Sequence, residues 1–118
     1  MAIKDILTIQ FLEGLEEVKK SLLILMFKQI SFYKKGVAYY VQFERGNTIV
    51  EFLFGPSDWN VEMIVYTSKG KFAFKELLQI PMIKQWVNNN RYKQENERDV
   101  KLELLWFVEL LKISLPLV

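Results

Sequence analysis

Carboxylates are the groups on which acid–base chemistry in this chain would mainly depend, because its 118 residues include neither Cys nor His. Their absence excludes a thiol nucleophile, an imidazole base and the ligands that transition metals prefer, although Mg²⁺ and Ca²⁺ can bind carboxylates alone. Glu44, Glu51 and Glu62 occur in strand-like segments and are expected on one face of a sheet. Two of them close together could serve as acid and base. The simpler interpretation is that all three are solvated and keep that face soluble.

Glu103 is a second candidate for chemistry. It falls between two apolar stripes of a helix predicted at 97–114, so its carboxylate is either at a wet boundary or buried and paired. We expect an ion pair with Arg91, Arg98 or Lys84, with a catalytic role as the alternative.

Other binding chemistries have little support in the sequence. The glycines are isolated and none opens a helix after a strand, so we expect no cofactor and no metal site. The chain has 16 Lys and Arg against 14 Asp and Glu, with no basic cluster beyond Lys34 and Lys35. It therefore lacks the footprint of a nucleic-acid-binding protein. The longest apolar run, 22–27, is far shorter than the ~20 residues that span a membrane, and no signal peptide is evident. We expect a soluble, cytoplasmic protein with one domain, 1–118.

The first part of the chain has the pattern of a long amphipathic helix, from 5 to 27. Apolar residues recur there at spacings of three and four, with charged residues opposite them. The apolar stripe consists of Leu7, Phe11, Leu15, Val18, Leu22 and Leu25 or Met26. Gly14 lies toward the polar side and indicates a kink or a close approach of another segment.

From about residue 29 the apolar period changes from 3.6 to 2, which predicts an antiparallel meander of four strands and a short fifth at 71–74. If Gly46 and Asn47 form a two-residue loop, the register of the central hairpin follows. One face is then wholly apolar and forms the core, pairing Phe43 with Val50, Val41 with Phe52 and Tyr39 with Phe54.

The other face of this hairpin is less polar than a solvent-facing sheet surface normally is. The register pairs Glu44 with Ile49, Gln42 with Glu51 and Tyr40 with Leu53, and Ile64 and Tyr66 are expected to join them.

The last third of the chain returns to helical patterns. We predict a helical turn at 75–80, a short helix that begins at Pro81 and ends at 88–90, and a closing helix from about 97 to 114 capped through Asn96 and Asp99. The closing helix is apolar on two sides and must be covered on both. Its stripes are, first, Val100, Leu104, Phe107, Val108, Leu111 and Leu115, and second, Leu102, Trp106, Leu110 and Ile113.

The second stripe has two candidate covers. The short helix with Met82, Ile83 and Trp86 could fold back onto it. Alternatively, the stripe could meet its own copy in a two-fold homodimer through the 97–114 helix.

Six side chains are candidates for contact with a protein partner. Trp59 lies in the polar turn 55–60 and either caps the core or anchors a partner, since Trp supplies a large contact area at low entropic cost. The others are its neighbour in the turn, two tyrosines of the mixed sheet face and two residues of the second helical stripe: Asp58, Tyr40, Tyr66, Trp106 and Leu110.

The layout resembles small bacterial single-domain α+β proteins of the toxin-immunity type. The shared features are a Cys-free chain of similar length, an N-terminal helix, a β-meander and a closing helix rich in Leu and Trp, as in 103–111. The order of one helix and four strands is also similar to cystatin-like and secretion-chaperone-like folds, in which a curved sheet wraps a long helix. This resemblance carries over no functional residue.

We therefore expect an α+β fold in which an N-terminal helix packs on an antiparallel 4–5-stranded meander, followed by two or three C-terminal helices. The expected function is a non-enzymatic protein-binding module, immunity-type or chaperone-like, that covers a partner protein. The alternative is a small-molecule-binding protein or a carboxylate-dependent hydrolase with a cavity between sheet and helix. A solid core favours the first, whereas a deep pocket containing Glu103 or two close strand glutamates favours the second.

Overall fold

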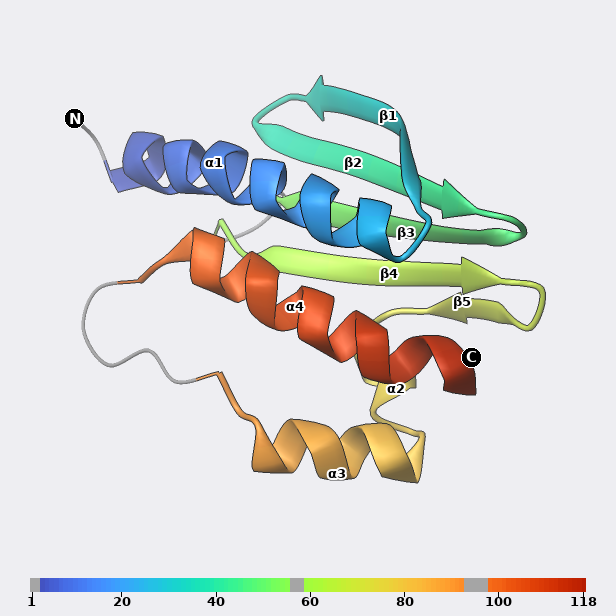
Figure 1. Ribbon diagram of the computed structural model, residues 1–118. Helices are drawn as coiled ribbons and strands as arrows, with labels where there is room; N and C mark the ends of the chain where they lie inside the picture. The colour runs from blue at the N-terminus through green and yellow to red at the C-terminus, as the bar shows by residue number, and fades with distance from the viewer. Residues whose placement is uncertain (1–2, 56–58, 93–97) are drawn as a thin grey trace.

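A computed structural model describes residues 3–55, 59–92 and 98–118, with the side chains of 3 and 4 left out of the description. It confirms the α+β fold: one long helix, a five-stranded antiparallel sheet and then the C-terminal helices (Figure 1). The elements are α1 (Ile3–Ile24), β1 (Lys28–Lys35), β2 (Ala38–Arg45), β3 (Thr48–Phe54), β4 (Val61–Thr67), β5 (Gly70–Phe72), α2 (Phe74–Leu77), α3 (Pro81–Asn89), α4 (Val100–Ser114) and the 3-10 helix η1 (Leu115–Leu117).

The strands are neighbours in the sheet in the order in which they occur in the chain. The predicted register of the central hairpin is confirmed on both faces, with Val41 opposite Phe52 and Gln42 opposite Glu51. Gly46 has a φ of 57°, which a glycine adopts at little cost and which a two-residue hairpin loop requires at its first position. Local turn chemistry therefore sets the register of the central hairpin.

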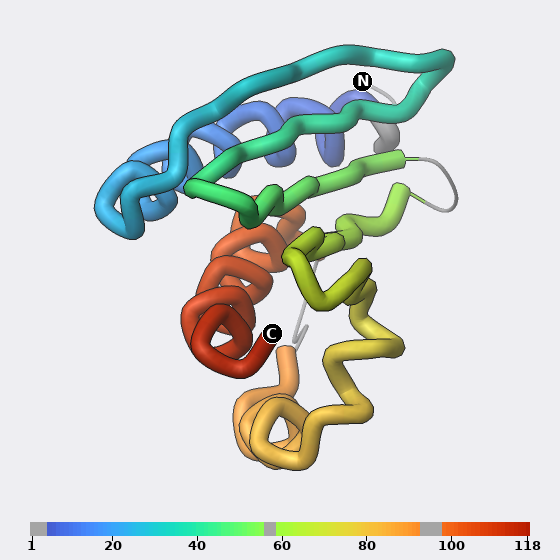
Figure 2. Tube along the Cα trace, turned by 90° about the vertical axis from the view of Figure 1, so that its right-hand side faces the viewer, coloured from blue at the N-terminus to red at the C-terminus, as the bar shows by residue number. Residues whose placement is uncertain are grey.

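The core lies between the sheet and two long helices, α1 and α4, which cover the same face (Figures 1 and 2). The predicted contact residues of α1, Phe11, Leu15, Val18 and Leu22, are all buried. Phe11 stacks on Phe54 with ring centroids 4.8 Å apart. Burial of these large side chains is the main source of stability in a domain of this size.

Helix α1 ends earlier than the sequence predicts, because Met26 adopts a left-handed φ of 70°. The N–H of Phe27 donates to the carbonyl of Leu22 at 2.8 Å and that of Met26 donates to Leu23 at 2.9 Å, which together form a Schellman motif. Phe27 is buried, whereas the side chain of Met26 is exposed. Of the two residues proposed for the end of the apolar stripe, Leu25 packs against the core and Met26 does not.

Gly14 marks a close approach of α1 to α4. It is buried rather than on the polar side as predicted, and a Cβ atom at this position would lie 2.9 Å from Cδ1 of Leu104 and 3.0 Å from Cα of Lys101. Nearby, Oε1 of Gln10 accepts a hydrogen bond from the backbone N–H of Val100 at 3.1 Å. The predicted close approach is thus confirmed, and it joins the first helix to the last.

The C-terminal helices follow the predicted order with shifted ends. Pro81 begins α3 as expected, and Ile83 and Val87 are buried, but Met82 of the predicted stripe is exposed. Helix α4 begins at Val100, because the carboxylate of Asp99 accepts hydrogen bonds from the backbone N–H groups of Lys101 and Leu102. The proposed capping role of Asn96 lies outside the described residues.

The second face of the sheet carries no helix among the described residues (Figure 2). Glu51 lies near its centre and is only 7% exposed, so the interpretation that all three strand glutamates are solvated was wrong for this one. The side-chain amide of Gln42 donates to Oε2 of Glu51 at 2.8 Å, and the hydroxyl of Ser31 donates to Oε1 of Gln42 at 3.1 Å. A row of hydrogen bonds across three strands thus compensates for burial of the carboxylate.

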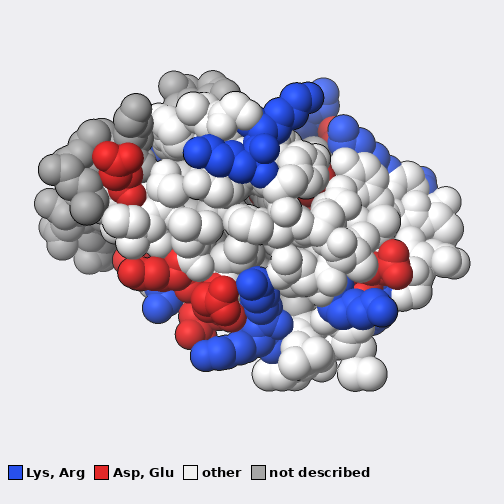
Figure 3. Space-filling model, turned by 90° about the horizontal axis from the view of Figure 1, so that it is seen from above, with Lys and Arg blue, Asp and Glu red and all other residues white. Residues whose placement is uncertain are grey.

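Charges of both signs are interspersed on the surface that Figure 3 presents, with wide uncharged areas between them. This face offers no large patch of one sign, in agreement with the near balance of 16 basic and 14 acidic residues. Within the described ranges, no helix combines the length and the apolar character that a membrane span requires.

Candidate functional site: a hollow beside the free edge of strand β4

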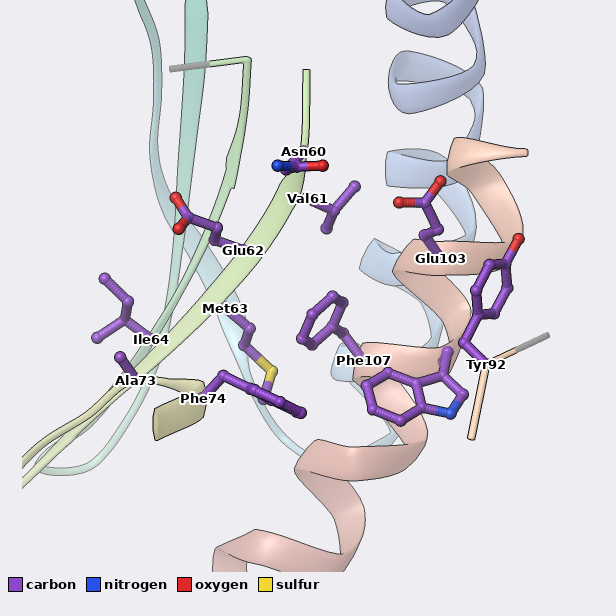
Figure 4. A pocket seen from close by; sticks show the side chains of 11 residues that line it. Asn60, Val61, Glu62, Met63, Ile64, Ala73, Phe74, Tyr92, Glu103 and Phe107 are labelled. Carbon is purple, nitrogen blue, oxygen red and sulfur yellow. The ribbon is translucent and has the colours of Figure 1, made fainter. Parts of the chain in front are cut away.

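A well-formed hollow lies between β4 and α4 and has a volume of about 430 Å³ (Figure 4). This volume is in the range of ligand-binding sites. Its walls come from consecutive residues of β4, the start of α2, the segment before α4, and α4 itself. The lining residues are Asn60, Val61, Glu62, Met63, Ile64, Ala73, Phe74, Tyr92, Glu103, Trp106 and Phe107.

The run 60–64 shows that the hollow extends along an edge of β4, because side chains of consecutive strand residues point to opposite faces. Strand β5 is too short to cover this edge: it pairs only with 65–67 and ends at Phe72. The chain then turns into α2, where Oε1 of Glu76 accepts a hydrogen bond from the N–H of Ala73 at 3.0 Å. The first half of β4 is therefore left without an outer neighbour among the described residues.

The pairing shows which backbone groups this edge presents. Thr67 lies opposite Gly70 across a two-residue turn, and Val65 lies opposite Phe72. In an antiparallel ladder, residues that form hydrogen bonds toward one neighbour alternate with those that bond toward the other. The N–H and C=O groups of Val61 and Met63 therefore point outward, whereas those of Glu62 and Ile64 bond to β3.

The other edge of the sheet, β1, is protected from strand addition. Lys28, Lys34 and Lys35 lie along it, and the ladder has a bulge between Gln29 and Ser31. Lysines and bulges are devices by which proteins prevent an edge from pairing with other chains. Residues 61–64 have neither device, and Glu62 is their one charged residue.

Aromatic side chains form the wall of the hollow opposite this edge. Trp106 contacts Phe107 edge-on with ring centroids 5.2 Å apart, and Phe74 lies 6.2 Å from Trp106. The indole N–H of Trp106 donates to the carbonyl of Asn90. The polar end of this side chain is thus satisfied, and its ring offers an apolar surface.

Glu103 forms one of the expected ion pairs, with Arg98. The Nε atom of Arg98 lies 2.7 Å from Oε2 of Glu103, and Nη2 donates to Oε1 at 3.0 Å. Nη2 also donates to the carbonyl of Trp59, whose backbone has a left-handed φ of 56°. This bidentate pair neutralises the carboxylate and fixes the turn at Trp59 against the start of α4.

Tyr92 closes the same end of the hollow. Its hydroxyl donates to the carbonyl of Asp99 at 3.2 Å. Burial, reinforced by the negative charges of Glu103 and Asp99, raises the pKa of Tyr92 above its ordinary value of 10.0. The side chain is therefore a neutral hydrogen-bonding group at physiological pH.

The five partner-binding candidates that the structure describes are not all brought together. Trp59 packs on Phe54 with ring centroids 5.8 Å apart and contacts the core, so the core-cap interpretation is confirmed. Tyr40 and Tyr66 lie on the second sheet face, where Tyr40 stacks on Tyr33 at 5.0 Å. Asp58 lies outside the described residues.

The second stripe of α4 is divided in the structure. Leu110 is fully buried, so its expected contact with a partner was wrong, whereas Leu102 stays 52% exposed. Trp106 lies against Trp86 of α3 with ring centroids 5.7 Å apart. The cover expected within the chain, in which the short helix folds back on this stripe, is therefore present.

Trp106→Glu is expected to release α3 from α4 and to lower the free energy of unfolding by about 1–2 kcal/mol, because it removes the ring contacts and places a charge against Trp86. Chemical denaturation measures this loss. Sedimentation of the unaltered protein tests the homodimer separately: a particle with the mass of one chain removes it.

Sequence reasoning missed the edge of β4 and the aromatic residues Phe74 and Phe107 as parts of one site. The available signal was a mismatch in length, because the strand predicted near 61–66 is longer than its predicted neighbour at 71–74. A long strand beside a short one leaves part of its edge free.

Within the described part of the chain, no three acidic side chains gather in a way that could hold a metal ion. Neither a protein-family model nor a curated protein nor a solved structure matches this chain.

Proposed function

We propose that this protein is a non-enzymatic protein-binding module that takes up an extended segment of a partner as an additional strand along β4. The observation that carries the proposal is the free backbone of Val61 and Met63 beside an aromatic hollow. In strand addition of this kind, main-chain hydrogen bonds supply affinity, and pockets for alternate side chains supply specificity.

The lining of the hollow favours an extended peptide over a compact ligand as the occupant. Five consecutive residues, 60–64, line it, so an occupant meets the edge of a strand and its unpaired donors and acceptors. A protein that sequesters a segment of its partner acts by covering it, as expected for an immunity-type or chaperone-like protein. The absence of Cys fits a cytoplasmic role, since such a chain needs no oxidising compartment.

Selection from a phage-displayed library of random peptides, followed by a backbone N-methyl scan of the selected peptides, tests the proposal. Every second peptide residue would direct its N–H toward Val61 or Met63. N-methylation at those positions is expected to weaken binding by about tenfold, because it removes a hydrogen bond and introduces a steric clash.

The remaining peptide residues are the matched control, because their N–H groups point away from β4 and methylation there should be tolerated. In NMR spectra the amide signals of Val61 and Met63 should shift and become protected from hydrogen exchange on binding. Failure to select any peptide, or affinity that is insensitive to N-methylation at every position, contradicts strand addition.

Binding of a small molecule is a second candidate, favoured by the presence of Glu103 in the hollow, which the sequence suggested as the sign of such a site. A hydrolase that uses two carboxylates has less support. Arg98 occupies both oxygens of Glu103, and Glu62 lies on the opposite side of β4 from Glu103 (Figure 4).

A further inference from the structure

The geometry points to a specific chemistry for the partner: an extended segment that reads apolar, basic, apolar opposite Met63, Glu62 and Val61. We take it to run antiparallel to β4, as every described strand of this sheet does to its neighbours. This inference rests on the proposed function. It adds which side chains the segment carries and in which order.

The apolar positions follow from the faces of the sheet. The side chains of Met63 and Val61 point into the core and are nearly fully buried. A residue paired with Met63 places its side chain on the same face, next to Phe74, Phe107 and the ring of Trp106. The Arg98 guanidinium already neutralises the carboxylate of Glu103 in this hollow. The hollow therefore offers an uncharged environment suited to a large apolar side chain.

The basic position follows from Glu62. Its side chain points to the other face and is exposed, and no described ion pair includes it. Lys75 and Lys84 line an adjoining hollow together with Glu62 and oppose its charge from that side, but neither forms a described ion pair with its carboxylate. A residue directly opposite in an antiparallel pair would lie about 4.5–5.5 Å from Glu62, near enough for opposite charges to attract.

The same residue argues against a second copy of this chain as the occupant. If two β4 edges paired around a two-fold axis with Val61 opposite Met63, Glu62 would lie directly opposite its own copy. Like charges in that position are destabilising. Glu62 therefore disfavours self-pairing of β4 in this register, while it favours a cationic partner residue.

A charge-swap experiment tests the inference. Two synthetic peptides are compared that differ only at the central residue of a Leu-Lys-Val or Leu-Glu-Val segment, against the unaltered protein and Glu62→Lys. The unaltered protein is expected to bind the Lys peptide roughly two- to fivefold more tightly than the Glu peptide, and Glu62→Lys should reverse the preference. Glu44→Lys is the matched control, since Glu44 lies on β2 away from this edge. The same change of charge at this position should leave the preference for the Lys peptide unchanged.

The outcomes separate this inference from the function on which it rests. Both peptides could bind with equal affinity and protect the Met63 amide from exchange, with affinities that Glu62→Lys leaves unchanged. In that case the proposed partner chemistry is wrong, while strand addition stands. If the preference reverses equally in Glu44→Lys, the effect is one of net charge, and the inference fails in that case as well. If neither peptide binds and the library selection also yields none, strand addition itself is wrong.

Discussion

Phe52→Ala is expected to lower the free energy of unfolding by about 3–5 kcal/mol, as truncation of a fully buried Phe does. Phe52 is 0% exposed and contacts Phe43 edge-on with ring centroids 6.1 Å apart. Domains of this kind have total stabilities of about 5–15 kcal/mol, so the variant will be close to the limit of folding. Urea denaturation followed by circular dichroism measures the loss.

Phe32→Ala is the matched control, because Phe32 and Phe52 lie in the same row of the sheet, on either side of Val41. Phe32 is 44% exposed at the edge strand, and its truncation should cost about 1 kcal/mol or less. Equal losses for the two variants would show that α1 and α4 do not cover the central strands as described.

Gly14→Leu is expected to destabilise the protein by about 1–2 kcal/mol in total, although Leu forms helices about 1 kcal/mol better than Gly. A side chain here has to displace Leu104 and the backbone of Lys101, and overpacking of this kind costs about 1–3 kcal/mol, occasionally more. Gly14→Ala should show a smaller loss of the same sign. Thermal and urea denaturation of both variants provide the measurement.

The neighbouring substitution Glu13→Leu controls for the added side chain, since Glu13 is exposed on the same helix. It should change stability by about 0.5 kcal/mol or less. Gly14→Leu with unchanged or increased stability would mean that α1 and α4 are farther apart than the structure has them.

The features that the sequence predicted correctly depend on short-range patterns. The register of the central hairpin follows from Gly46 and the period-2 alternation around it, and the ion pair of Glu103 with Arg98 joins residues five positions apart. The end of α1 was predicted too late because Met26, unlike glycine or asparagine, gives no sequence signal of a left-handed residue.

Apart from the mismatch in length between the last two strands, the candidate site could not be predicted, because it depends on where elements distant in sequence end and pack. The edge of β4 is free because β5 ends at Phe72 and the side chain of Glu76 accepts a hydrogen bond from the N–H of Ala73 at the start of α2. The hollow forms because α4 lies beside that edge. Val61 and Met63 are residue types that also occupy ordinary core positions of strands. Their identity therefore gives no sign that their backbone groups are unpaired.

The contact between α1 and α4 has a consequence for synthesis of the protein. The contact joins Gln10 to Val100, which are 90 positions apart. Helix α1 is therefore synthesised long before the helix that it packs against, α4. Until α4 leaves the ribosome, the sheet and α1 expose the apolar surface that α4 later buries, and nascent chains in this state are prone to aggregate. Slow translation of the codons for α4 should therefore lower the yield of folded protein more than slow translation of the codons for α1.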